Sequence, residues 1–67
     1  MPRRQNLAKL ESAYREADRC LKTLTSLIEP FLRKNDPVLN DLLGEAIGSV
    51  DHTRKKIYEI LQKVTAT

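Results

Sequence analysis

Two stripes of apolar residues, arranged as mirror images around one break, restrict this 67-residue chain to very few folds. In each stripe the steps alternate between three and four residues, which is the spacing of helices that pack by knobs into holes. Only Thr53 departs from the apolar pattern. The first stripe comprises Leu7, Leu10, Tyr14, Ala17, Leu21, Leu24, Ile28 and Phe31, and the second comprises Leu39, Leu43, Ala46, Val50, Thr53, Ile57, Ile60 and Val64.

The break between the stripes carries the signals of a helix end followed by a helix start. Asn35 tolerates the left-handed conformation that ends a helix. Asp36 is a favourable N-cap, and Pro37 then occupies the first helical position, where its missing N–H has no consequence. The sequence therefore predicts helices over about 6–34 and 37–65, joined by a turn at 35–36.

Pro30 lies inside the first predicted helix. A proline in a helix interior removes one backbone hydrogen bond and clashes with the carbonyl four residues earlier. Two outcomes are open: a kink near Pro30, or a stop at Ile28 followed by a short segment through Lys34. Because the stripe continues to Phe31, we favour the kink.

A turn this short requires the two helices to run antiparallel. Folding the chain at 35–36 then pairs the stripes rung by rung, from Phe31 with Leu39 to Leu7 with Val64, and the numbers of each pair add to 70 or 71. The predicted fold class is all-α, an antiparallel two-helix hairpin that resembles a coiled coil.

Apolar residues also flank both stripes, at Ala13, Cys20 and Leu27 and at Leu42, Ile47 and Leu61. Three apolar positions per heptad are typical of a helix buried on two sides. We therefore expect a homodimer that forms a four-helix bundle. The alternatives are a partner protein's helix in the groove and an isolated hairpin.

Gly44 and Gly48 lie one turn apart inside the second predicted helix, where each costs roughly 1 kcal/mol relative to alanine. Their spacing allows another backbone to approach closely; the alternative is a helix surface that is simply not optimised. Together with the flanking leucines and isoleucine they make the predicted partner interface: Leu27, Leu42, Gly44, Ile47, Gly48 and Leu61.

The chain offers no set of residues for catalysis, for a cofactor or for a metal ion. His52 is the only histidine and Cys20 the only cysteine. We expect His52 to be exposed, although a phosphate-accepting histidine on a helical bundle is an alternative. We expect Cys20 to pack in the core, since a free cysteine behaves as a small hydrophobe. The chain is therefore predicted not to be an enzyme.

The net charge of +3 is unevenly distributed. Residues 1–20 and 51–67 each carry a net +2 and lie at the open end of the hairpin, whereas residues 21–50 carry a net −1. Basic side chains at one end could contact phosphates, so a hairpin that binds nucleic acid through Arg54, Lys55 and Lys56 is the alternative function. Acidic residues among them make a solvated surface the favoured interpretation.

The favoured function is a noncatalytic protein–protein interaction module, acting as an adaptor, an assembly subunit or a small chaperone in the cytoplasm. The turn Asn35-Asp36-Pro37-Val38-Leu39 and the chain length resemble the small two-helix co-chaperones and needle subunits of bacterial secretion systems. The resemblance is confined to this turn and implies a hairpin that covers a partner's helix.

Overall fold

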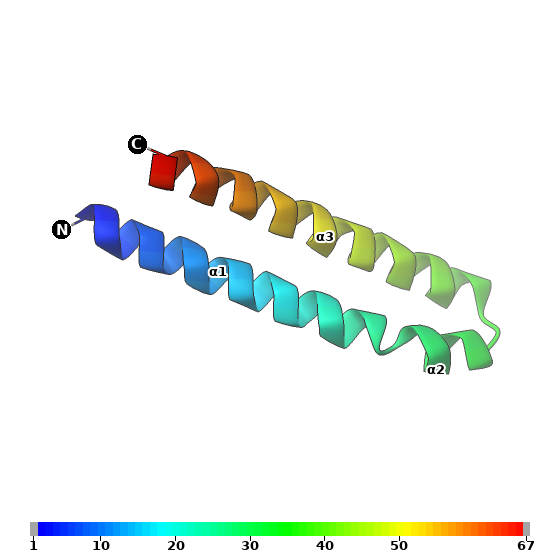
Figure 1. Cartoon of the computed structure of the whole chain (residues 1–67). Helices are drawn as coiled ribbons and strands as arrows, with labels where there is room; N and C mark the ends of the chain where they lie inside the picture. Colours follow the sequence, from blue (N-terminus) through cyan, green and yellow to red (C-terminus); the bar gives the residue numbers. More distant parts are fainter. Residues whose placement is uncertain (1, 67) are drawn as a thin grey trace.

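The computed structural model describes residues 2–66, with side chains from Gln5 onward, and this part of the chain folds into three helices. Helix α1 spans Pro2–Thr25, α2 spans Ile28–Arg33 and α3 spans Pro37–Ala66. The predicted all-α fold is confirmed. Helices α1 and α2 follow one another along one side, and α3 runs back antiparallel beside both (Figure 1). The open end and the turn therefore lie at opposite ends of the hairpin.

The hairpin is a rod of 51 × 14 × 13 Å with a radius of gyration of 15.5 Å. A compact domain of this length has a radius of gyration of about 11 Å. The elongated shape leaves one layer of side chains between two helices, so little of the apolar surface is enclosed. Within residues 2–66, no helix has both the length and the apolar character needed to cross a membrane.

The first half of the hairpin is interrupted between Thr25 and Ile28, which differs from the expected kinked helix over 6–34. The alternative stop at Ile28 also places the break later than the structure does. Pro30 explains the position, because its ring would clash with the carbonyl of Ser26 and it has no N–H to donate to that carbonyl. The chain therefore leaves the helix before Ser26, and the N–H of Phe31 then bonds to the carbonyl of Leu27 at 3.0 Å.

Hydroxyl side chains satisfy the carbonyls at the end of α1. The hydroxyls of Thr23, Thr25 and Ser26 donate to the carbonyls of Arg19, Lys22 and Thr23 at 3.0, 2.9 and 2.6 Å. Such bonds compete with the regular helical ladder. The carbonyl of Lys22 also accepts the N–H of Ser26, whereas the N–H of Leu27 bonds to Leu24, so the Ser26 hydroxyl replaces the helical donor at the carbonyl of Thr23. The hydroxyl-rich segment four to seven residues before Pro30 was the sequence signal for this break.

The turn has the geometry that the sequence predicts. Asn35 adopts a left-handed conformation with φ of 54°. The Oδ1 atom of Asp36 accepts hydrogen bonds from the N–H groups of Val38 and Leu39 at 3.1 and 3.2 Å. Pro37 is the first residue of α3. The turn residues therefore end one helix, cap the next and reverse the chain.

The N-cap gives a first testable prediction. Substitution Asp36→Ala leaves two N–H groups at the start of α3 without their acceptor, so we expect the free energy of unfolding to fall by about 1 kcal/mol. Chemical denaturation followed by circular dichroism measures this change. Asp36→Asn is the matched control, because an asparagine side chain also accepts at the N-cap and should retain most of the stability. Equal losses in both variants would contradict the capping role.

Among the side chains that the structure describes, Leu43 is the one buried in the seam between the helices, and it keeps 8% of its surface exposed. Thr53 and Ile60, predicted members of the second stripe, are exposed, while Arg54 and Leu61 are half-buried in their places. Counting heptad steps of four and three from Leu43 leads to 47, 50, 54, 57, 61 and 64. Val50, Ile57 and Val64 therefore keep their predicted places in the seam, while Arg54 and Leu61 replace Thr53 and Ile60 at the alternate positions.

The first half of the hairpin, formed by α1 and α2, also departs from the predicted stripe at its break. Leu27 is half-buried and Ile28 is exposed, the reverse of the predicted stripe, because the turn at Ser26–Leu27 resets the helical phase. The cross-helix register also moves: Tyr14 stacks near Tyr58, with ring centroids 6.0 Å apart. The numbers of this pair and of the Asp18–Arg54 ion pair add to 72, rather than 70 or 71.

Candidate functional site

The seam has two long edges, and helical geometry separates them. Residues two positions apart on a helix lie about 200° apart around its axis, so they flank a seam on opposite sides. Asp18 and Cys20 are such a pair on α1, and Tyr58 and Ile60 are such a pair on α3. The edge that carries Asp18 and Tyr58 and the edge that carries Cys20 and Ile60 are therefore different surfaces.

An ionic cluster of Asp18, Lys22, Asp51, Arg54 and Lys55 occupies the first edge at the middle of the rod. The Arg54 guanidinium bridges the helices, with Nη1 2.9 Å from Oδ1 of Asp18 and Nη2 2.9 Å from Oδ1 of Asp51. Lys22 lies 3.2 Å from Asp18, and Lys55 lies 3.1 Å from Asp51. Each carboxylate thus meets two cations. The Arg54 side chain is only 26% exposed, so it covers the seam with its aliphatic part.

The cluster keeps both carboxylates ionised. Hydrogen bonds from Lys22 and then Arg54 lower the pKa of Asp18, and a hydrogen bond from Lys55 is the main cause that lowers the pKa of Asp51. The pKa of Arg54 is raised, chiefly by its hydrogen bond to Asp18. Groups held in their charged forms by such contacts are suited to fixing the register of two helices rather than to proton transfer.

This arrangement changes the interpretation of the predicted phosphate-contacting residues. Arg54 and Lys55 are paired with aspartates of the ionic cluster, and Lys56 lies 3.4 Å from Glu59. A cation already paired with a carboxylate attracts a phosphate less strongly than an unpaired one, because the field of the pair decays faster than that of a single charge. The three side chains do not form a basic surface separate from acidic groups.

An apolar groove lies on the same edge at the turn end, between α2 and the first half of α3. We call it the turn-end groove. Leu32 is exposed, and the Oδ1 atom of Asn40 is shielded from water with no hydrogen-bond partner within the described residues. The lining residues are Ile28, Leu32, Asn40, Leu43, Gly44 and Ile47. A helix laid in this groove would cover apolar side chains and could donate to Asn40.

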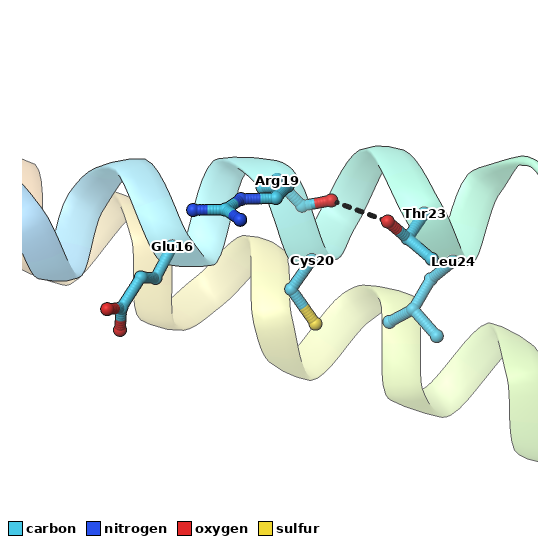
Figure 2. Close-up of a pocket in the computed structure, with 5 residues that line it drawn as sticks. All are labelled: Glu16, Arg19, Cys20, Thr23 and Leu24. Atoms are coloured by element: carbon cyan, nitrogen blue, oxygen red, sulfur yellow. Dashed lines mark hydrogen bonds between the residues drawn. The ribbon is translucent and has the colours of Figure 1, made fainter.

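The second edge carries the flank face, which we define as Ala13, Cys20 and Leu24 on α1 with Leu42, Ala46 and Ile60 on α3. Leu42 is 57% exposed and Ile60 is 46% exposed. Cys20 is exposed, so the prediction of a core cysteine is wrong. Cys20 lies beside the seam rather than in it, and two helices alone leave that position uncovered. Figure 2 shows Cys20 and Leu24 extending from α1 on the side of α3, in an open pocket that Glu16, Arg19 and Thr23 complete.

The structure divides the predicted partner interface. Leu42 lies on the flank face, whereas Gly44 and Ile47 line the turn-end groove. Gly48 is exposed one turn further along α3. The two remaining members, Leu27 and Leu61, are half-buried in the hairpin, because both fall on the seam between the helices. The residues of the predicted partner interface are therefore divided between exposed surfaces of the hairpin and two positions in its seam.

The glycines give a second prediction. A Cβ atom added at Gly44 or Gly48 would have no atom within 4 Å, so nothing inside the hairpin requires a glycine there. We expect Gly44→Ala and Gly48→Ala each to raise the free energy of unfolding by about 1 kcal/mol, through the lower conformational entropy of the unfolded chain. Urea denaturation checks this. A loss of stability in either variant would show that another chain closely contacts that glycine.

His52 is exposed on the outer side of α3. Across the described side chains, no three His, Cys, Asp or Glu residues are placed to share a metal ion. No protein family, no curated protein and no solved structure matches this chain.

Proposed function

We propose that this chain is a noncatalytic protein–protein interaction module, a helical hairpin whose exposed apolar surfaces are covered by further helices. A second copy of the chain or a partner's amphipathic helix would provide the cover. Adaptor, assembly subunit and small chaperone are the roles that such a module serves, and the cytoplasm is the expected compartment. The two surfaces concerned are the turn-end groove and the flank face.

The observation that carries this proposal is the amount of surface that the hairpin leaves in contact with water. Its solvent-accessible surface is 5352 Å². A compact monomer of the same mass exposes about 4,300 Å². The surplus of about 1,000 Å² is of the same order as the ~800 Å² that each partner contributes to a stable protein–protein interface. An additional helical layer would therefore bring the hairpin to the burial of a normal small domain.

The geometry of the exposed surfaces favours a helix as the covering element. Both run along the axis of a straight rod, and their large apolar side chains recur at helical spacing, as between Ile28 and Leu32 in the groove. An amphipathic helix packs into such a surface through residues at the same spacing. A loop would leave backbone polar groups unpaired against the apolar side chains.

The test compares solution mass and thermal stability of the full chain over a wide range of concentrations. An associated species whose unfolding temperature rises with concentration supports cover by a second copy. A monomer with helical content but no cooperative unfolding supports cover by another protein. A monomer that unfolds cooperatively at one temperature, whatever the concentration, would contradict the proposal, because it would be stable with both surfaces exposed.

Charged substitutions then identify the surface that associates. Leu42→Asp alters the flank face and Leu32→Asp alters the turn-end groove, and both replace exposed side chains, so the hairpin itself should still fold. His52→Asp is the matched control on the outer side of α3. We expect one of the two apolar variants to weaken association at least ~10-fold, because it buries an unpaired charge in the interface. Equal association in all three would count against both surfaces.

Salt dependence separates this proposal from the alternative of nucleic-acid binding. Association through apolar surfaces should change little between low and high salt, whereas contacts to phosphates weaken steeply as salt is added. Binding of nucleic acid that is strongly salt-dependent, and that is lost in Lys55→Gln with Lys56→Gln, would favour the alternative. The pairing of both lysines with carboxylates supports the apolar interaction instead.

A further inference from the structure

We infer that the flank face pairs with the same face of a second copy, that the two turns lie at opposite ends of the dimer, and that the two-fold axis passes beside Cys20. This inference rests on the proposed function and names its partner. Three independent features of the hairpin lead to it: the position of the apolar residues along the rod, the distribution of charge and the area of the face.

The first feature is the symmetry of the flank face along α3. Because two contacts between α1 and α3 join residues whose numbers add to 72, Cys20 lies at the level of His52 on α3. Leu42 and Ile60 then lie about 15 Å and 12 Å from that level, on opposite sides, at 1.5 Å per residue. A two-fold axis at Cys20, perpendicular to the rod, brings Leu42 of one copy to the level of Ile60 of the other.

The same axis gives a consistent arrangement along the first half of the hairpin. Ala13 and Leu24 lie on either side of Cys20 along α1, so the axis places apolar side chains of the two copies near one another. In the middle of α3, Ser49 and Thr53 are both exposed, and the axis brings Ser49 of one copy to within about 3 Å of the level of Thr53 of the other. One face thus pairs with itself, as an isologous two-fold interface requires.

Charge selects the antiparallel arrangement. Among the side chains that the structure describes at the open end, residues 51–66 carry a net +2 and residues 5–20 carry no net charge, whereas residues 21–50 at the turn end carry a net −1. With both turns at the same end, the basic ends of the two copies would lie together and repel each other. With the turns at opposite ends, each basic end lies against the slightly acidic end of the other copy. Because these charges lie far apart, the difference in electrostatic energy between the two arrangements is largest at low salt.

The area of the face is sufficient for a stable dimer. A rod of 51 Å by 14 Å presents a flat projection of about 700 Å² on one side, close to the ~800 Å² per partner of a standard interface. Glu16 and Arg19 line the pocket around Cys20 and carry opposite charges, whereas Cys20, Leu24 and Ala46 carry no charge. Two hairpins packed in this way form a four-helix bundle.

Cys20 itself provides the test. A disulfide requires two Cα atoms within about 7 Å. With the turns at opposite ends, α1 faces α1 of the second copy, and the two Cys20 side chains approach at the axis. With the turns at the same end, Cys20 faces α3 of the other copy, and the two cysteines lie diagonally across the bundle, beyond that reach.

The experiment treats the full chain with diamide, which takes up the two electrons and two protons that the thiols lose, and follows the disulfide-linked dimer on a non-reducing gel. The control is Cys20→Ser combined with Lys22→Cys, whose new thiol lies on the edge of the ionic cluster. We expect the native chain to cross-link at least ~10-fold faster, because thiols held in one dimer have an effective concentration in the millimolar range. Leu42→Asp should remove that advantage.

The outcomes separate this inference from the proposed function. Association without faster cross-linking of Cys20 overturns the antiparallel dimer and leaves an interaction module with another geometry. A monomer that lacks cooperative unfolding also overturns the dimer, and it leaves a module that needs a different partner. A cooperative, concentration-independent monomer overturns both. A second pair, Ser49→Cys mixed with Thr53→Cys in the Cys20→Ser background, should cross-link between copies and confirms the axis independently of Cys20.

Discussion

Substitution Leu43→Ala is expected to remove about 2–5 kcal/mol from the free energy of unfolding, which is the usual range for a buried leucine. Leu43 is the most buried of the described side chains, at 8% exposure, and it lies where α3 meets α2. A single core in a chain this small supplies no more than about 3–5 kcal/mol in total. We therefore expect the variant to lose most of its cooperative unfolding transition.

Urea denaturation followed by circular dichroism at a helical wavelength measures the loss. Val38→Ala is the matched control on the same helix, because Val38 is 67% exposed and its truncation should change stability by less than ~0.5 kcal/mol. Similar transitions in the two variants would mean that the enclosed position of Leu43 contributes little, and that the hairpin is stabilised elsewhere along the seam.

Substitution Arg54→Glu is expected to destabilise the hairpin strongly, because it brings a third carboxylate against Asp18 and Asp51 at a half-buried position of the seam. The repulsion acts between the two helices, so it opposes the pairing of α1 with α3 directly. Arg54→Met is the informative control. It removes the charge but keeps an unbranched side chain on a heptad position, and Asp18 and Asp51 retain Lys22 and Lys55 as partners.

We expect Arg54→Met to stay close to the native unfolding temperature, since replacing a charged group at a seam by an apolar one of similar length is often neutral. Arg54→Glu should unfold at a clearly lower temperature. If both variants unfold at the same temperature, the loss arises from the missing guanidinium alone and repulsion among carboxylates is not its cause.

The ionic cluster also predicts the pH dependence of stability. Asp18 and Asp51 have folded-state pKa values below the ordinary 3.8, so the unfolded chain binds protons more readily than the folded one. Their stabilising contribution is complete above that value and is lost as the pH falls through the lowered pKa values. Unfolding temperatures measured from pH 6 downward should therefore drop below about pH 4, and less steeply in Arg54→Met than in the native chain.

The residues around the turn were sufficient to predict the local structure from the sequence. Asn35 with φ of 54°, the Asp36 cap and Pro37 at the first position of α3 each act within four residues of their own position. The all-α fold followed from the spacing of the apolar stripes. Pro30 predicted a disturbance in the first helix, and its clash with the carbonyl of Ser26 places the break at Ser26–Leu27, where hydroxyl side chains bond to the carbonyls of the last turn.

The register of the seam required the tertiary structure. Thr53 and Arg54 are neighbours in the sequence. Because neither is an apolar residue, the spacing of apolar residues does not decide which of them lies at the heptad position. Only the approach of α1 brings Asp18 to Arg54, and that contact makes the arginine a seam residue while Thr53 and Ile60 become exposed. The same packing also assigns Leu61 to the seam and leaves Leu42 on the surface.

The sequence by itself therefore determined the helices, the turn and the antiparallel direction, because propensity, capping and turn chemistry are local and act within one or two turns of helix. The tertiary structure alone decided which residues enclose the seam, where Cys20 lies and which surfaces remain uncovered. A small rotation of α3 about its axis exchanges Thr53 and Ile60 for Arg54 and Leu61 at the seam while leaving the hydrogen bonds of α3 intact, so only the packing of the two helices against each other selects the register.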